Sequence, residues 1–361
     1  MRRTSIFTLF LALLLTATAA AQSTAQSTQV DEYVRAEMGK QRIPGLTLAV
    51  VKDGKIIKAE GYGLANAEHK IPARPETVFK IGSVSKQFIA VGVLLLAQDG
   101  KLSLGDPVKK HFPDAPETWS GITIRHLLLH TSGLPREGPG FDALKIQADA
   151  DVIKSAYNSP LIFATGTKWE YCNLGYFMLA EIIQRVSGQP WGDFLAARVF
   201  RPLEMSATRT TTPVEVIPNR ADGYVWRNDR LQNADEYRAL RPSGAFISTV
   251  LDLAKWDAAL YGDQILKAAL REEMWKPAAE TNRKLSDGTT DSYGYGWFIG
   301  KLEGHRQVFH GGSLPGFRAH LARFVDDRLT IIVLTNGDGA RPEGIANSVA
   351  AFYLTEKKSG H

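Results

Sequence analysis

The tetrapeptide SVSK, residues 83–86, places a hydroxyl and an amine three residues apart at the start of the apolar stretch FIAVGVLLLAQ. If this stretch is helical, residues three apart share a face, so Ser83 Oγ and Lys86 Nζ can meet at hydrogen-bond distance. A serine hydroxyl becomes a nucleophile when a neighbouring base takes its proton. A lysine can be that base when desolvation lowers its pKa from ~10.4. The spacing predicts a nucleophilic Ser83 that is activated by Lys86.

A second interpretation of the same residues needs no chemistry: Ser83 caps the helix and Lys86 extends to solvent. The two interpretations differ in where the amine goes, since an unpaired ammonium is costly to bury. In the first, Ser83 also lies at a helix N-terminus, where free backbone amides favour a developing oxyanion. The S-x-x-K motif occurs once in the chain, but serine and lysine are common residues, so other motifs must decide.

Tyr171 and Asn173 form the only Y-x-N in the chain, just before the helical pattern NLGYFMLAEIIQRVSG. A tyrosine beside a lysine ammonium can be held as phenolate and can carry the serine proton to a leaving group. Asn173 has a donor and an acceptor, which allow it to fix the lysine and to bind a substrate amide. The alternative is that Tyr171 only packs under the following helix.

The segment VFHGGSLPGF contains His310, Gly311 and Gly312 at the end of an expected strand. Two residues without side chains would let a substrate backbone lie along the strand next to a titratable imidazole. The amide of Ser313 would then be a second oxyanion donor. By themselves, glycines at such a position are more often part of a turn or bulge than of a site.

These three motifs, in this order, resemble the serine β-lactamase and penicillin-binding-protein superfamily, whose motifs are S-x-x-K, Y-x-N and K-T-G or H-x-G. The sequence is most similar to the group of class C β-lactamases, D-Ala-D-Ala carboxypeptidases and family VIII esterases. Segments such as GYGLAN, LLLHTSGLP and SGAFISTVLDLAKW extend the resemblance over nearly the whole chain after residue 21. It implies a sheet domain and a helical domain with the serine between them, and no cofactor or metal.

The resemblance also implies a role for each motif residue. Ser83 would be acylated, Lys86 and Tyr171 would be the general base and acid, and Asn173 would bind the substrate and the lysine. His310 stands where relatives have lysine or histidine, and the amides of Ser83 and Ser313 would form the oxyanion hole, with Gly311 and Gly312 lining the substrate strand.

One departure bears on the substrate. His310-Gly311-Gly312 replaces the K-T-G of β-lactamases, and a histidine with a pKa near ~6.5 is mostly neutral at pH 7. Esterase or peptidase chemistry is therefore expected over efficient β-lactam hydrolysis, with Arg318 as a candidate replacement for the missing positive charge. The alternatives are a D,D-carboxypeptidase or D-aminopeptidase acting on cell-wall peptides, a β-lactamase, and a catalytically silent binding protein on the same fold.

Two further features suggest other chemistry. Cys172, the only cysteine, lies between Tyr171 and Asn173 and could be mistaken for the nucleophile, but a packed, inert thiol is expected. His126 and His130 have the i, i+4 spacing of zinc ligands, but no glutamate stands between them. The expectation is that no metal binds there.

The patterns around these motifs predict an α/β (α+β) fold. A strand pair turns at Asp53-Gly54, and strand patterns return near the C-terminus, with a tight turn expected at Asp326-Asp327. One antiparallel sheet built from both chain ends, with helices inserted, is the expected architecture. The sheet part is expected at about 30–82 and 285–358 and the helical part at about 83–284, with 204–245 unassigned.

The first 21 of the 361 residues have two arginines, a short apolar core and small residues ending at Ala21, which is typical of a cleaved secretory signal. The apolar core is too short for the ~20 residues of a membrane span. We therefore expect residues 22–361 to be secreted or periplasmic, without a stable membrane anchor. Removing Arg2 and Arg3 lowers the formal charge from +5 to +3, and no basic run suggests nucleic acid as a partner. The expected partner is a small molecule or short peptide.

Overall fold

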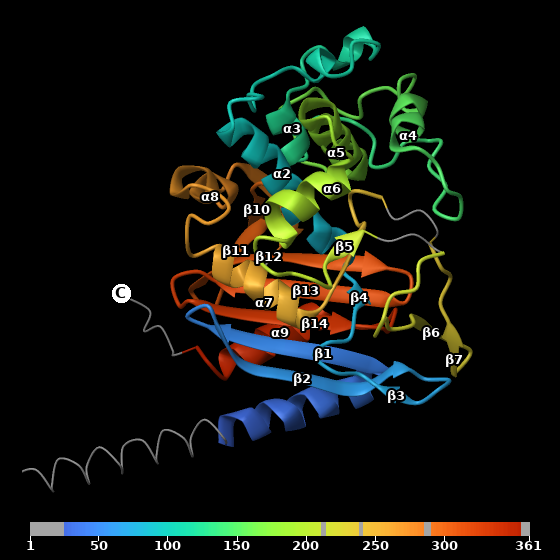
Figure 1. Cartoon of the computed structure of the whole chain (residues 1–361), viewed down its shortest axis with the longest axis vertical. Helices are drawn as coiled ribbons and strands as arrows, with labels where there is room; N and C mark the ends of the chain where they lie inside the picture. Colours follow the sequence, from blue (N-terminus) through green and yellow to red (C-terminus); the bar gives the residue numbers. More distant parts are fainter. Residues whose placement is uncertain (1–24, 211–213, 238–240, 285–289, 355–361) are drawn as a thin grey trace, which may run out of the picture.

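The computed structural model describes residues 25–210, 214–237, 241–284 and 290–354. Within them, nine strands form one sheet in the order β3-β2-β1-β14-β13-β12-β11-β10-β9, with neighbours antiparallel (Figure 1). Their bounds are β1 Gly45–Lys52, β2 Lys55–Asn66, β3 Ile71–Pro72, β9 Ala279–Lys284, β10 Thr290–Tyr293, β11 Phe298–Leu302, β12 His305–Leu314, β13 Phe317–Phe324 and β14 Leu329–Thr335.

The sheet joins the two ends of the chain, because β1 pairs with β14, with Leu48 opposite Val333. The predicted first turn is present: Asp53 and Gly54 have φ of 52° and 72°, the left-handed values that a two-residue hairpin turn requires. These observations confirm the predicted fold class, a mixed α/β fold with a large antiparallel sheet and a helical region.

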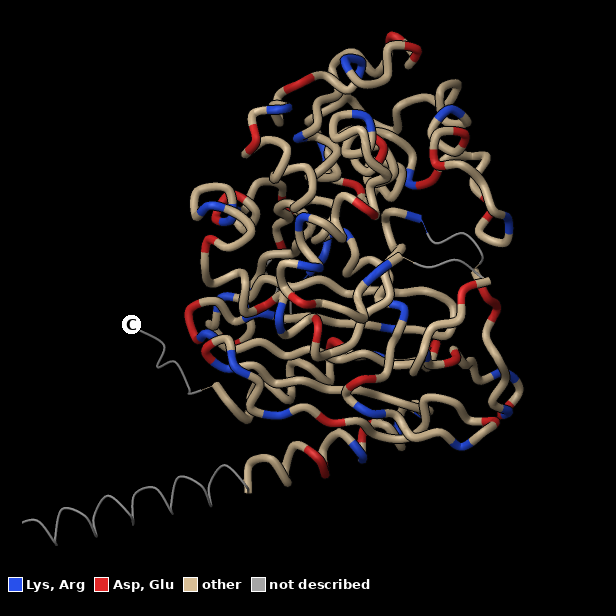
Figure 2. The backbone as a smooth tube through the Cα atoms, in the orientation of Figure 1, with Lys and Arg blue, Asp and Glu red and all other residues tan. Residues whose placement is uncertain are grey.

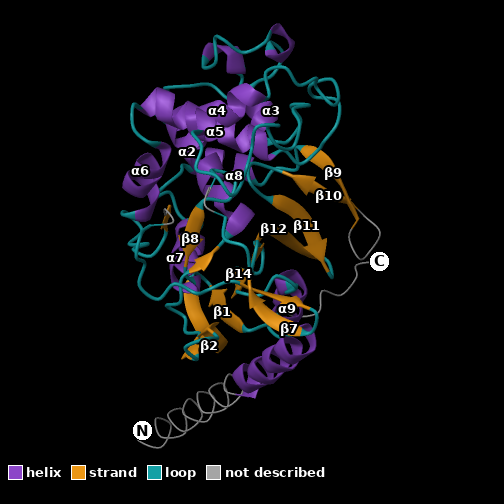
Figure 3. Cartoon of the chain, turned by 90° about the vertical axis from the view of Figure 1, so that its right-hand side faces the viewer, coloured by secondary structure: helices purple, strands orange, loops and turns teal. Residues whose placement is uncertain are grey.

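Each face of the sheet has its own apolar core, since successive side chains of a strand point to opposite faces. Leu48 and Val50 pack with the N-terminal helix, residues 25–41, and with α9 (Pro342–Ala351). Ala49 and Val51 of the same strand belong to the larger core, on the side of α7 (Val250–Ala259) (Figure 3). The result is three layers of helix, sheet and helix.

A helical body lies beyond the β12 side of the sheet (Figure 1). Its central helix α2 is buried from Lys86 to Leu96 on every side, as its continuous apolar sequence predicts. The helix α5 ends just before Gly188, the last residue of the helical pattern NLGYFMLAEIIQRVSG, which has the left-handed φ of 73°. The helices of this body are α2 Lys86–Gln98, α3 Ile124–Leu128, α4 Asp149–Ser155, α5 Asn173–Ser187 and α6 Trp191–Leu195.

The structure differs in three places from the expectation that residues 83–284 form a helical part. The helix α7 packs on β1 and β14 of the sheet, and β9 is a strand of that sheet. The unassigned middle contributes short strands outside the large sheet. These differences arise because burial against the sheet, and not helical periodicity, decides where such segments lie. The remaining elements are β4 Phe79–Lys80, β5 Arg209–Thr210, β6 Tyr224–Arg227, β7 Arg230–Asn233, β8 Phe246–Ser248 and α8 Ala268–Met274.

Two smaller expectations concern the chain ends and a turn. The tight turn expected at Asp326-Asp327 is present: the Arg328 N–H donates to the Val325 oxygen at 3.3 Å, and the two aspartates are the central residues between β13 and β14. The expected signal segment, residues 1–21, lies outside the described residues. In the part that the structure describes, no helix is long and apolar enough to cross a membrane. Figure 2 shows basic and acidic residues scattered among each other along the described chain.

Candidate active site

Ser83 lies where the small strand β4 leads into the helical body. The chain leaves β4, forms the 3₁₀ turn η1 (Gly82–Ser85) and continues directly as α2, whose first residue is Lys86. The Ser83 side chain makes no capping hydrogen bond at either helix start. Lys86 is fully buried, so it does not extend to solvent. The capping interpretation of the S-x-x-K motif is therefore wrong in both of its parts.

Three oxygens surround the Lys86 amine. Its Nζ lies 3.2 Å from Ser83 Oγ, 2.7 Å from Asn173 Oδ1 and 2.9 Å from the backbone oxygen of Ser243. Burial lowers the pKa of Lys86 well below its ordinary value, against the opposing effect of the Glu137 carboxylate. A neutral amine has two N–H groups and one lone pair. The two carbonyl oxygens can only accept, so the lone pair is left for the hydroxyl proton of Ser83.

Asn173, the first residue of α5, is held from both ends. Its backbone N–H donates to the oxygen of Arg136 at 2.9 Å, and its Nδ2 donates to Glu137 Oε1 at 2.5 Å. The second contact fixes the amide so that Oδ1 faces Lys86. The sequence motifs gave no sign of Glu137 or of the Ser243 carbonyl, because both come from loops far from Asn173 in sequence.

Tyr171 lies over the amine, with Lys86 Nζ 4.7 Å from the centre of its ring. Burial raises the pKa of Tyr171, and the nearby Ser83 hydroxyl and Arg136 lower it less. The phenol is therefore protonated. The prediction that Tyr171 is held as a phenolate is wrong. Its physical reason is that the ring is packed against aromatic neighbours, with the His130 ring 4.4 Å away, beside a lysine whose pKa is itself lowered by burial.

The strand β12 runs against η1 so closely that side chains would not fit between them. A Cβ on Gly312 would lie 1.9 Å from the Ile81 oxygen, and one on Gly82 would lie 2.7 Å from the Ser313 nitrogen. The backbone amides of Ser83 and Ser313 therefore belong to two backbone segments in close contact. Leu314 and Phe317 close the β12–β13 hairpin, so the alternation of the ladder turns the Ser313 N–H away from β13 and leaves it free for a substrate oxygen.

The His310 side chain lies under the cleft among aromatic residues and is 2% exposed. Its Nδ1 lies 2.6 Å from the Gly311 oxygen and its Nε2 lies 3.1 Å from the Tyr293 hydroxyl. Burial lowers the pKa of His310 to about 3. The ring is therefore neutral, with its proton on Nδ1, and accepts from Tyr293 of β10, a residue that no motif indicated.

Arg318 of β13 lines the same cleft as Ser83. Its guanidinium donates to the backbone oxygens of Leu314 and Phe317 at 2.8 and 2.9 Å, and pairs with Asp338 at 2.9 Å. These partners hold the β12–β13 turn. A role for Arg318 in binding a substrate carboxylate stays a prediction.

The residues that suggested other chemistry have structural partners. Cys172 Sγ accepts the Gly175 N–H at 3.3 Å at the start of α5, and burial raises its pKa to about 12, so the thiol is inert. His130 Nδ1 accepts the Cys172 N–H at 3.1 Å. His126 Nδ1 accepts the Thr123 N–H at 3.2 Å. Each histidine thus stabilises the backbone near it.

Two cavities meet at Ser83. The larger, of about 910 Å³, is also lined by Tyr171, His310 and the strand residues Gly311 to Ser313. The smaller, of about 240 Å³, is lined by Ser83, Ser313, Glu137 and Asn173 among others. A carbonyl carbon held at Ser83 would therefore have one substituent in each cavity.

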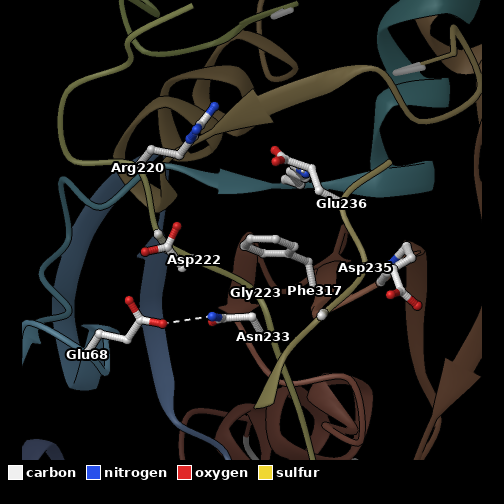
Figure 4. Close-up of a pocket in the computed structure, with 12 residues that line it drawn as sticks. Glu68, Arg220, Asp222, Gly223, Asn233, Asp235, Glu236 and Phe317 are labelled. Atoms are coloured by element: carbon white, nitrogen blue, oxygen red, sulfur yellow. Dashed lines mark hydrogen bonds and ion pairs between the residues drawn. The ribbon is translucent and has the colours of Figure 1, made fainter. Parts of the chain in front are cut away.

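A third pocket, of about 250 Å³, lies elsewhere, between the β4 and β6 regions (Figure 4). Its walls include Glu68, which accepts a hydrogen bond from Asn233 at 2.7 Å, and Phe317. Ser83 and Lys86 are not among the described residues that line it. It is not the place where the motif residues meet.

Comparison with known proteins gives independent evidence on the family of this chain. A family model described as Beta-lactamase matches residues 30–355. Penicillin-binding protein 4* of Bacillus subtilis is 33% identical over 318 residues, 82% of this chain and 69% of that protein. Protein flp of Staphylococcus aureus is 28% identical over 316 residues, 85% of this chain but 62% of that protein. The chain therefore spans under two thirds of the flp length.

Two solved structures have the same fold. The octameric penicillin-binding protein homologue from Pyrococcus abyssi has a TM-score of 0.84 and 28% identity, covering 91% of this chain and 77% of that one. The D-amino acid amidase from Ochrobactrum anthropi SV3, complexed with D-phenylalanine, has a TM-score of 0.79 and 24% identity over 92% of this chain and 99% of that one.

Proposed function

The chain belongs to the Beta-lactamase family of hydrolases, and we propose that it is a serine hydrolase that cleaves an ester or amide through an acyl-enzyme on Ser83. The observation that carries this proposal is the Lys86 amine. It is fully buried and 3.2 Å from Ser83 Oγ, and both of its N–H groups have carbonyl acceptors. Its one lone pair is available to the Ser83 proton.

In the proposed reaction, Ser83 Oγ attacks the substrate carbonyl carbon while its proton passes to Lys86 Nζ. The carbonyl oxygen becomes an oxyanion that accepts from the backbone N–H groups of Ser83 and Ser313. Tyr171 donates its hydroxyl proton to the leaving group, and the Lys86 ammonium replaces that proton. Water then attacks the acyl-enzyme by the reverse proton path and releases the acid.

The neutral, buried His310 supports an ester or peptide-like amide over a β-lactam as the preferred substrate. A lysine at this position would offer a cation for a substrate carboxylate, whereas the His310 ring has its two nitrogens occupied. Action on D-amino-acid peptides is the second candidate, favoured by the likeness in fold to a D-amino acid amidase. We also propose that the chain is exported after cleavage near Ala21, which intact-mass analysis of the mature protein would test.

The decisive experiment is intact-protein mass spectrometry after brief exposure to a fluorophosphonate, p-nitrophenyl butyrate, a chromogenic cephalosporin and D-alanyl-D-alanine. The wild type should form an adduct that Ser83→Ala lacks, and the exposed Ser120→Ala should behave as wild type. Turnover of the butyrate without the cephalosporin would fit the proposal. A folded protein that forms no adduct and turns over none of these compounds would instead be a silent binding protein.

A further inference from the structure

His130 occupies a turn that most often takes glycine. It follows α3 and the C-cap residue Leu129, and its φ of 61° lies in the left-handed region. The His130 N–H donates to the Leu127 oxygen at 3.4 Å. The Thr131 N–H donates to the His126 oxygen at 3.0 Å, which completes the hydrogen-bond pattern of a Schellman cap. A histidine adopts this conformation at a cost that glycine does not have, so its side chain is expected to have a use.

Two acceptors of His130 bind the segment that contains Tyr171. The His130 backbone oxygen accepts the Glu170 N–H at 3.0 Å, and the imidazole Nδ1 accepts the Cys172 N–H at 3.1 Å. These two N–H groups belong to the residues immediately before and after Tyr171. One residue therefore holds the backbone of Tyr171 on both sides.

The imidazole of His130 also contacts the phenol ring. The two ring centres are 4.4 Å apart with 39° between the ring planes, and His130 is 1% exposed. The rings of Tyr176 and Tyr293 contact the imidazole as well, with centres 5.1 and 4.7 Å away. Burial lowers the pKa of His130 well below its ordinary value, and a neutral imidazole has one nitrogen that accepts. The ring is thus a fixed, packed surface beside Tyr171.

We propose that His130 is a positioning residue for Tyr171 and holds the phenol hydroxyl where it can protonate the leaving group. This inference rests on the proposed function, since it assumes that Tyr171 is the proton donor. Proton transfer requires hydrogen-bond distance, and a displacement of about 1 Å can cost about 10²-fold in rate. His130 is not among the described residues that line either cavity at Ser83, so it acts through Tyr171 and not on the substrate.

Three substitutions separate this role from that of a simple cap on α3. His130→Gly suits the left-handed turn but removes the Nδ1 acceptor and the ring. His130→Asn also suits the turn, and its Oδ1 is as many bonds from the backbone as Nδ1, so the Cys172 N–H keeps an acceptor. His130→Phe fills the space of the imidazole without an acceptor. It replaces the glycine variant in the test if the cavity that glycine leaves prevents folding.

The readout is the ratio of kcat/KM for ethyl butyrate to kcat/KM for p-nitrophenyl butyrate. Both esters give the same acyl-enzyme, but ethoxide needs a proton to leave and p-nitrophenolate does not. The ratio should fall at least about 10-fold in His130→Gly and His130→Phe, and should stay within about 3-fold of the wild-type value in His130→Asn. A loss of activity that affects both esters equally cancels in the ratio.

His126→Asn is the matched control, because it changes the other histidine of the same cap. Its Nδ1 accepts the Thr123 N–H and not an N–H of residues 170–172. This variant should leave the ratio at the wild-type value. A fall like that of His130→Gly would show that any disturbance of α3 lowers the ratio, and would overturn the specific role of His130.

A double substitution gives a second readout. In Tyr171→Phe the hydroxyl is already absent, so the addition of His130→Gly should not lower the ratio further. If His130→Gly lowers the ratio by the same factor with and without the hydroxyl, His130 acts independently of Tyr171 and the inference is overturned.

The outcomes distinguish this inference from the proposed function beneath it. If Tyr171→Phe lowers the ratio but folded His130→Gly and His130→Phe do not, the role of His130 alone is overturned. A fall in His130→Asn as large as in His130→Gly would overturn the role of the Nδ1 hydrogen bond. A ratio that Tyr171→Phe leaves unchanged, or a folded wild type that forms no Ser83 adduct, would overturn the proposed function and this inference with it.

Discussion

Lys86 Nζ lies 2.7 Å from Asn173 Oδ1, although 87 residues separate the two in sequence. The contact joins the first residues of two packed helices, α2 and α5, at the ends that face the cleft. The Asn173 amide is in turn fixed by Glu137 at 2.5 Å. The orientation of the candidate base is thus set by the packing of the helical body, and it does not depend on the S-x-x-K motif alone.

The lowered pKa of Lys86 predicts the shape of the pH profile. In the proposed mechanism the active form is the neutral amine, so kcat/KM should reach its plateau well below the ordinary pKa of a lysine and fall tenfold per pH unit below the lowered pKa. Esterase assays from pH 4 to 10 would measure this. A rate that climbs tenfold per unit between pH 7 and 10 would show a lysine with an ordinary pKa and contradict the prediction. Lys86→Arg, which cannot lose its proton, should reduce kcat/KM by about 10²- to 10⁴-fold.

Tyr171→Phe should affect poor leaving groups more than good ones. The proposed role of the hydroxyl is to protonate the leaving group, which an amine needs and a p-nitrophenolate does not. We expect a loss of about 10²- to 10⁴-fold with an alkyl amide and under 10-fold with p-nitrophenyl butyrate. Kinetics on both substrates would check this, and equal losses would mean that the hydroxyl acts on Ser83 and not on the leaving group. The ring itself keeps its aromatic neighbours in this variant.

Gly312 and Gly311 give a matched pair of substitutions. A Cβ at position 312 would lie 1.9 Å from the Ile81 oxygen, so Gly312→Ala must push β12 away from η1 and separate the two backbone amides proposed to bind the oxyanion. Losing one such donor costs about 10²- to 10³-fold in kcat. A Cβ on Gly311 would have its nearest contacts at 3.7 Å. Gly311→Ala should therefore change the free energy of unfolding by no more than about 0.5 kcal/mol, as surface substitutions do. Thermal unfolding and kcat of both variants would be measured, and equal activity in the two would contradict the role of this close approach.

Buried neutral histidines predict sensitivity to acid. Burial lowers the pKa of His310 to about 3 and that of His320 to about 4, from 6.5 in the unfolded chain. Between the folded and unfolded pKa values, the unfolded state binds more protons than the folded state. The free energy of unfolding is therefore not reduced by these histidines above pH 6.5. It falls as pH drops toward 4, by about 1.4 kcal/mol per unit for each histidine.

Urea unfolding between pH 7 and 4.5 would measure this loss. His320→Gln should show a shallower loss than wild type, while His69→Gln, at an exposed position, should show the wild-type slope. Parallel curves for all three proteins would contradict the assignment of the acid sensitivity to His320.

Local chemistry explains why much of the fold was predictable from the sequence. The Asp53-Gly54 turn and the stop of α5 at Gly188 depend on backbone angles that only a few residue types adopt readily. The burial of α2 follows from its unbroken apolar run. The short spacing of Ser83 and Lys86 likewise allows only nearby positions for their side chains on a helix. The strand β9 and the place of α7 were missed because their own periodicity does not say which surface covers them.

The sequence by itself determined which groups carry the candidate chemistry: a hydroxyl, an amine, a phenol and an amide in recognisable motifs. Only the tertiary structure decided their states. Packing removes both side chains from water, which lowers the pKa of Lys86 well below its ordinary value and raises the pKa of Tyr171. The Ser243 carbonyl, Glu137 and Tyr293 complete the site from distant segments. Protonation and hydrogen-bond partners depend on burial and distance, and these arise only when separate elements of the chain pack together.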